Sequence, residues 1–183
     1  RAIRAIVLYP MNALVSDQLG RLRLMLGGPE KEFFEIWNSG GRRGRRPQFG
    51  MYTGRTPYPG EKRSKEKDAE YAGTLLRDLV EISDDDKAIL RSSGKYPEKH
   101  DLQRYAEKLK AGLPGWSAID AEMLTRFEMR EHTPDILITN YSMLQYMLIR
   151  RIESPIWEST KAWLDRNPDE KLLFIIDEAH MYK

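Results

Sequence analysis

The chain has 183 residues, 40% hydrophobic and 32% charged, with a net charge of +2 at pH 7 and no cysteine. This composition is typical of a globular domain large enough to bury a core, and it excludes a disulfide framework and a thiolate metal site. No stretch approaches the roughly 18 apolar residues of a membrane-spanning helix, so we expect a cytoplasmic protein that engages no membrane. Because the chain begins with Arg1 rather than Met, has a predicted strand from residue 5 and ends three residues after His180, we also expect a fragment of a larger protein.

Positive charge is concentrated at the start of the chain. Residues 1–60 hold ten Lys and Arg against four Asp and Glu, a net of +6, whereas residues 61–183 hold twenty against twenty-four, a net of −4. A basic first third suits a surface that meets phosphate groups, but an ordinary solvated basic loop would give the same asymmetry. The segment from Arg42 to Arg46 is compatible with both interpretations, because it could bind DNA or serve as a mobile connector.

Apolar strands alternate with amphipathic helices along the chain. The first strand is a short apolar run with β-branched residues. The two helices after residues 10 and 140 have Leu or Met at helical spacing. The predicted strands are residues 5–9, 48–52, 135–140 and 172–176; the predicted helices are residues 11–26, 141–152 and 157–164, with a helical insertion at 61–131. This alternation indicates an α/β fold with a parallel sheet and flanking helices.

The most informative segment is the last strand and the four residues that follow it. Leu172 to Ile176 form an uncharged apolar run, which predicts a strand buried on both faces of the sheet. Asp177, Glu178, Ala179 and His180 come directly after it, and open α/β sheets bind their ligands at the carboxyl ends of strands. Asp-Glu-Ala-His in this setting resembles motif II of the DEAD/DEAH-box helicases of superfamily 2.

Three other segments extend that resemblance. The strand, turn and helix around Asn12 and Arg21 resemble motif Ia, and Thr53-Gly54-Arg55 after the second strand resembles motif Ib. The segment from Thr133 to Leu144, which contains Thr139 and Asn140, resembles the strand-to-helix segment called motif Ic. Backbone N–H groups, amides and an Arg fork are suited to phosphate oxygens, although each segment alone is also compatible with ordinary capping or a plain loop.

The resemblance implies a fold, an activity and a set of roles. Residues 1–60 and 132–183 would be parts of one RecA-like ATPase domain, with 61–131 as a helical insertion of unassigned role. Asp177 would hold Mg²⁺, Glu178 would activate the water that attacks ATP, and His180 would relay the state of the nucleotide. Asn12, Arg21, Thr53, Gly54, Arg55, Thr139 and Asn140 would contact the nucleic-acid backbone.

The implied cofactors are ATP and Mg²⁺, and the implied partners are a nucleic acid, with DNA favoured, and a second RecA-like domain of the same parent chain. The amino-acid sequence of residues 8–23 and 52–60 is most similar to that of large bacterial anti-phage defence helicases. This similarity adds defence proteins as possible partners. No P-loop is present, because Ile89 and Tyr96 occupy positions that such a loop around Gly94-Lys95 would need for Gly and Ser/Thr. We therefore expect the chain alone to be inactive.

Two alternatives stay open at this level. The fold could serve as a nucleic-acid-binding or interaction scaffold without turnover. Asp177 and Glu178 could instead belong to another Mg²⁺-dependent phosphohydrolase, which would need further carboxylates near them.

Overall fold

The computed structural model describes residues 1–10, 12–28, 45–57 and 65–181. They form two compact units, which we call unit 1 (residues 1–19, 48–57 and 123–183) and unit 2 (residues 20–47 and 58–122). Within the described ranges, no helix has the length and apolar character needed to cross a membrane.

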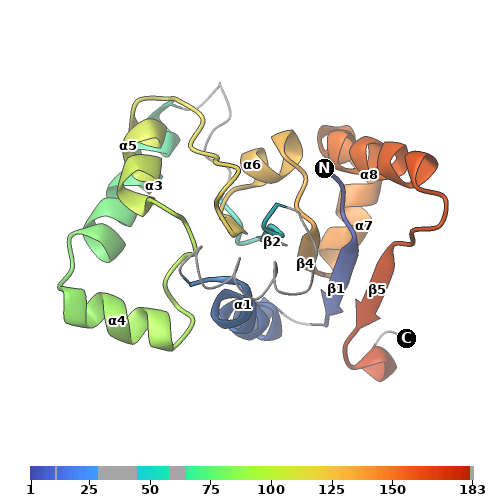
Figure 1. The fold of residues 1–183 in the computed structure, drawn as a ribbon, viewed down its shortest axis with the longest axis horizontal. Helices are drawn as coiled ribbons and strands as arrows, with labels where there is room; N and C mark the ends of the chain where they lie inside the picture. The colour runs from blue at the N-terminus through green and yellow to red at the C-terminus, as the bar shows by residue number, and fades with distance from the viewer. Residues whose placement is uncertain (11, 29–44, 58–64, 182–183) are drawn as a thin grey trace. The chain divides into compact units, whose positions relative to one another are not determined.

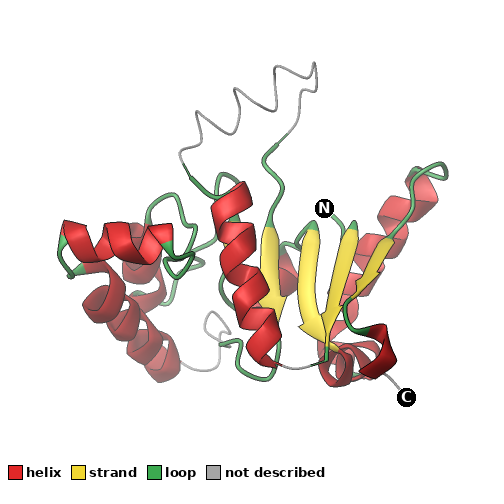
Figure 2. Ribbon diagram, turned by 90° about the horizontal axis from the view of Figure 1, so that it is seen from below, coloured by secondary structure: helices red, strands yellow, loops and turns green. Residues whose placement is uncertain are grey.

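Unit 1 is built on a five-stranded parallel sheet with flanking helices, an arrangement of the RecA-like kind, which confirms the predicted fold class (Figure 1). The strands follow the order β3-β2-β4-β1-β5 across the sheet, and Figure 2 shows them side by side. Their bounds are β1 Ala5–Tyr9, β2 Phe49–Tyr52, β3 Glu122–Met123, β4 Ile136–Asn140 and β5 Leu173–Ile176. All but the short β3 were predicted to within one residue.

Two helices of unit 1, α6 and α7, begin after residues whose side chains cap them. The Asn140 side chain accepts a hydrogen bond from the Met143 N–H at 2.8 Å, and Thr125 forms a capping box with Glu128. The α8 helix is tied to the start of the chain, because the Thr160 hydroxyl accepts a hydrogen bond from the Ile3 N–H at 3.1 Å. The helices are α6 Arg126–Glu131, α7 Tyr141–Ile149 and α8 Ser154–Arg166, with short 3₁₀ turns η2 Arg151–Glu153 and η3 Ala179–Met181.

The middle of the sheet is buried, but the last strand is not. Ile6, Phe49 and Leu137 have no exposed side-chain surface, whereas the side chains of β5 are 45–55% exposed. The prediction that residues 172–176 are buried on both faces was therefore wrong. An uncharged run shows only that a strand has apolar side chains. Among the described residues β5 is the edge of the sheet and pairs with β1 alone.

The part of unit 2 that the structure describes is helical apart from its share of β3. Its helices are the second part of α1 (Asn12–Leu26), α3 Lys65–Leu75, the π-helical η1 Leu76–Val80, α4 Asp84–Ser92 and α5 Leu102–Lys110. Leu102, Tyr105, Ala106 and Leu109 form the buried stripe of α5, as expected for an amphipathic helix. Asp101 and Ser83 accept hydrogen bonds from backbone N–H groups at the starts of α5 and α4.

The grouping of residues into units differs from the boundaries read from the sequence. The end of the expected insertion, from Met123 onward, belongs to unit 1, and the Arg126 N–H donates to the Pro57 carbonyl at 2.9 Å. Residues 20–47 belong instead to unit 2, where Arg23 forms two hydrogen bonds of 2.8 and 2.7 Å with Glu122.

A buried polar cluster holds the end of β2. The Tyr52 hydroxyl donates to Glu153 Oε1 at 3.0 Å, and both side chains are buried. The Arg126 guanidinium lies 5.2 Å from the centre of the Tyr52 ring and donates to the Thr53 carbonyl. Burial first, and then the Glu153 carboxylate, raises the pKa of Tyr52 well above its usual value near 10.

We expect Tyr52→Phe to destabilise the chain by about 1–3 kcal/mol, because the buried Glu153 carboxylate loses a hydroxyl donor and keeps the longer ion pair with Arg150 at 3.6 Å on that oxygen. Thermal unfolding would measure the change, with Tyr146→Phe as the matched control because Tyr146 is 59% exposed. Equal losses in the two variants would contradict the role of the cluster.

The raised pKa of Tyr52 also predicts a dependence on pH. Folding favours the neutral phenol, so its contribution is complete below the unfolded pKa of about 10 and is lost as pH rises above it. The wild type should therefore lose more stability than Tyr52→Phe between about pH 9.5 and 11. Parallel stability curves over this range would contradict the burial of an ionisable phenol here.

The exposed edge strand predicts self-association of the 183-residue chain. Within the described ranges no strand pairs with the outer side of β5, which also carries four half-exposed apolar side chains, and such an edge favours pairing between sheets. Ile175→Lys should shift the sedimentation velocity profile toward monomer. Ile89→Lys is the control, since Ile89 is 64% exposed but lies on the helix α4, and an equal effect of both would contradict pairing through β5.

Candidate functional site

The carboxyl ends of four strands meet along one edge of the sheet. The parallel register pairs Tyr52 with Thr139, Tyr9 with Asn140 and Leu8 with Ile176, each at or next to the end of its strand. The segments that follow β2, β4, β1 and β5 therefore leave the sheet at the same edge. We call it the carboxyl edge, and it brings together the predicted motifs Ia, Ib, Ic and II.

Asp177 and Glu178 lie at the carboxyl edge directly after β5, and both are exposed. The Asp177 N–H donates to the Leu8 carbonyl at 3.0 Å, which extends the pairing of β5 with β1 by one residue. The Asp177 Oδ1 accepts a hydrogen bond from the Glu178 N–H at 3.0 Å, which fixes the orientation of this carboxylate. His180 follows, exposed, in the turn η3.

Glu178 has a backbone conformation that is unusual for its residue type. Its φ is +48°, and no other non-glycine residue in the described ranges has a positive φ. The left-handed conformation costs an L-residue with a Cβ about 1–2 kcal/mol, and such strain clusters at functional sites. The strained residue is also the one that motif II would use to activate water.

The turn after β2 presents Gly54 and Arg55 to solvent. The turn is closed by Thr56, whose hydroxyl accepts from the Thr53 N–H at 2.9 Å and donates to the Met51 carbonyl at 2.7 Å. Thr53 is 1% exposed, and its hydroxyl accepts from the Arg55 N–H at 3.2 Å. Direct contact with a ligand is therefore open to Gly54 and Arg55, while the Thr53 side chain shapes the turn.

Thr139 and Asn140 end β4 with their side chains in use. The Thr139 hydroxyl is buried and donates to the Tyr52 carbonyl at 2.6 Å, so it joins the ends of β4 and β2. Asn140 is half-buried and caps α7. Thr139 therefore links two strands, and Asn140 caps a helix while it keeps partial access to solvent. The predicted contacts of these two residues with nucleic acid stay predictions.

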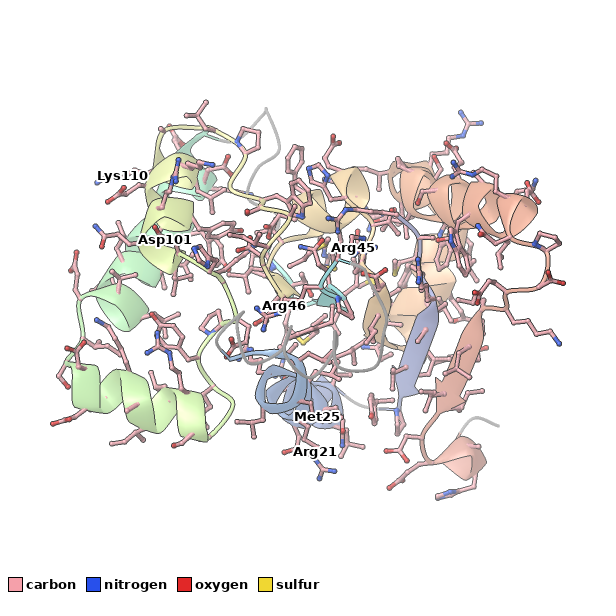
Figure 3. All side chains as sticks on the ribbon, in the orientation of Figure 1. Arg21, Met25, Arg45, Arg46, Asp101 and Lys110 are labelled. Atoms are coloured by element: carbon pink, nitrogen blue, oxygen red, sulfur yellow. The ribbon has the colours of Figure 1, made fainter. Side chains whose placement is uncertain are left out.

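The remaining two predicted residues lie on α1. Asn12 is the first residue of this helix, directly after β1 and Pro10, and its side chain falls outside the described part. Arg21 belongs to unit 2, where it is exposed on α1 near Met25 (Figure 3). Asn12 thus joins the carboxyl edge through its place in the chain, whereas Arg21 belongs to the other unit.

The side chains at the carboxyl edge suit Mg²⁺ that is also bound by phosphate and water, rather than a metal ion whose ligands all come from the protein. The described residues contain no group of three or more His, Cys, Asp or Glu placed to hold a metal. Mg²⁺ in nucleotide sites takes one or two carboxylates and completes its shell with phosphate oxygens and water. A single exposed carboxylate such as Asp177 fits that requirement.

Sequence reasoning missed the side chains that support the turn after β2. Arg126 donates to the Thr53 carbonyl, although the two residues are 73 positions apart in the sequence. Glu153 accepts from the Tyr52 hydroxyl, and these residues are 101 positions apart. Arg126 lies in what reads as a charged insertion, so no local pattern marks it. The buried aromatic residue at the end of a predicted strand was the only available signal, since a buried Tyr needs a partner for its hydroxyl.

One residue of the Arg-rich segment, Arg46, differs from its prediction. Arg46 is 6% exposed and donates to the carbonyls of Leu26 and Gly28, at the end of α1. It is therefore a structural residue and not part of a mobile connector. Arg45 is exposed, and residues 42–44 lie outside the described ranges.

Comparison with known proteins gives one curated match. The chain is 40% identical over 203 aligned residues to the Druantia protein DruE of Escherichia coli (strain UMEA 4076-1). The match includes 98% of this chain and 11% of that protein, so the chain spans about a tenth of its relative's length. No family model matches the chain, and no solved structure matches it. The chain is thus similar along nearly its whole length to a short part of a Druantia protein.

Proposed function

We propose that this chain is most of the first motor domain of a nucleic-acid-dependent ATPase, a helicase or translocase that acts on DNA. The observation that carries the proposal is the position of Asp177 and Glu178. They are exposed after a parallel strand, at the same sheet edge as Gly54, Arg55 and Asn140. The likeness to DruE and the resemblance to anti-phage defence helicases together favour a role in defence, with the parent protein supplying the other parts of the motor.

The two carboxylates would divide the chemistry between them. Bound ATP and Mg²⁺ would supply the phosphoanhydride bond and the neutralisation of its charge. Asp177 would hold the ion, with its Oδ1 oriented by the Glu178 N–H. Glu178 would accept a proton from the attacking water at a carboxylate oxygen, and His180, in the next turn, would link this site to the rest of the motor.

The nucleic acid would lie along the carboxyl edge on the side of β2 and β4. Arg55 offers a charged donor fork, and Gly54 lets the backbone approach a strand without a side chain between them. Asn12 and Asn140 would add neutral donors. These groups suit phosphate and sugar, so binding should be independent of base sequence and strongly dependent on salt.

Substitution of the proposed base tests the assignment. In the parent protein, Glu178→Gln should lower DNA-stimulated ATP hydrolysis by about 100-fold or more, because an amide cannot take the proton, and should leave DNA binding intact. Glu158→Gln, an exposed residue of α8, is the control and should keep full activity. Turnover that survives Glu178→Gln would contradict the assignment, and a wild type that binds DNA without turnover would instead favour a scaffold.

The backbone strain at Glu178 makes a separate prediction. Glu178→Gly should leave the free energy of unfolding unchanged or raise it by about 1 kcal/mol, because Gly adopts a positive φ without cost, while turnover is lost. Glu178→Ala keeps the strain and is the matched control. If Gly destabilises the fold more than Ala in chemical denaturation, Glu178 is not strained in solution.

A further inference from the structure

Unit 2 contains a cleft that the proposed motor chemistry does not use. Its volume is about 720 Å³, within the range of small-molecule sites. The cations that line it are Arg23, Arg46, Arg91 and Lys99, together with His100 and one carboxylate, Glu98. We call this the unit 2 cleft. An excess of positive side chains in one concave site favours an anionic ligand.

Three of the four cations are committed to the fold. Arg23 is paired with Glu122, and Lys99 forms an ion pair with Asp120 at 3.0 Å. Arg46 donates to the carbonyls at the end of α1. These groups keep the wall of the cleft positive, but their donors are largely occupied.

Arg91 and His100 are different. Both are exposed, and neither side chain has a carboxylate partner within the described ranges. The Arg91 guanidinium lies 4.5 Å from the centre of the Tyr96 ring, which restrains its plane and leaves its N–H edge available for a bidentate anion. The imidazole of His100 can add a further donor on the wall of the same cleft.

The single carboxylate does not cancel this arrangement. Glu98 accepts a hydrogen bond from the Gly28 N–H at 3.1 Å, so it is used to hold the end of α1. Tyr96 and Pro97 add an apolar wall beside the cations. A planar apolar group next to an anion is the combination found in a nucleotide.

We propose that the unit 2 cleft binds a phosphate ester of one nucleotide, with the phosphate on Arg91 and His100, and that this nucleotide belongs to the bound DNA strand. The inference rests on the proposed function and adds a second contact with the same nucleic acid. A free nucleotide carries the same chemistry, so the experiment must distinguish the two sources.

The test compares DNA affinity of the parent protein and its variants by fluorescence anisotropy with a labelled single-stranded oligonucleotide. Arg91→Gln and His100→Ala should each weaken binding several-fold, and Arg91→Gln should lower the salt slope by about one phosphate contact. Glu98→Gln should bind at least as tightly as wild type. The control is Arg77→Ala, an exposed residue of unit 2 paired with Asp78 outside the cleft, and it should change nothing.

If Arg91→Gln binds DNA with unchanged affinity and salt slope, the proposal that the unit 2 cleft binds DNA is wrong, and the motor assignment is unaffected. If the wild type does not bind DNA, the proposed function is wrong. Titration calorimetry with dAMP then tests whether the cleft binds a free nucleotide. Heat of dAMP binding that disappears in Arg91→Gln supports a free-nucleotide site, and absence of wild-type binding overturns the inference. Unchanged melting temperatures confirm that the variants are folded.

Discussion

The parallel register of β2, β4, β1 and β5 is the constraint on which the candidate site depends. Backbone pairing sets Tyr52 against Thr139, Tyr9 against Asn140 and Leu8 against Ile176. Side chains from four distant segments reach the carboxyl edge because of these pairs. A slip by one residue would reverse the face of every side chain in the strand concerned. The link from the Thr139 hydroxyl to the Tyr52 carbonyl fixes this register at the edge itself.

Support for the site comes from buried polar groups behind the exposed ones. Exposed Gly54 and Arg55 depend on Thr56, which closes their turn, and on Arg126, which holds the Thr53 carbonyl. Glu178 is held differently, because its partner Asp177 is itself exposed: the Asp177 carboxylate accepts from the Glu178 N–H, and the Asp177 N–H donates to the Leu8 carbonyl. In the turn after β2, loss of one partner of a buried hydrogen bond would leave the other unsatisfied at a cost in stability. The backbone of the residues open to a ligand is therefore positioned before any ligand arrives.

The sequence predicts β1, β4 and β5 well because short apolar runs that contain Ile or Val favour a strand over a helix. It predicts the burial of β5 badly, since the burial of Phe174 depends on what lies beside the strand and not on the strand's own residues. It also misses β3, because two residues carry no periodicity. Arg126 and Glu153 could not be assigned from the sequence, because their partners lie 73 and 101 residues away. The positive φ of Glu178 has no sequence signal either, since the residues that tolerate it best are Gly and Asn.

The difference between the carboxyl edge of unit 1 and the interior of unit 2 bears on what each unit can do. At the carboxyl edge the charged side chains are exposed, and the backbone N–H groups of Arg55 and Glu178 are hydrogen-bonded to Thr53 and Asp177. This state is suited to chemistry with a ligand that enters and leaves. In unit 2 the ion pairs of Arg23 and Lys99 are buried, and burial of this kind persists only when both partners stay in place. Their loss would leave a buried carboxylate, so they specify one arrangement of the cleft wall. Arg91 is the exposed cation of that wall, with its guanidinium 4.5 Å from the centre of the Tyr96 ring, and a donor restrained in this way loses less conformational freedom when it meets a phosphate.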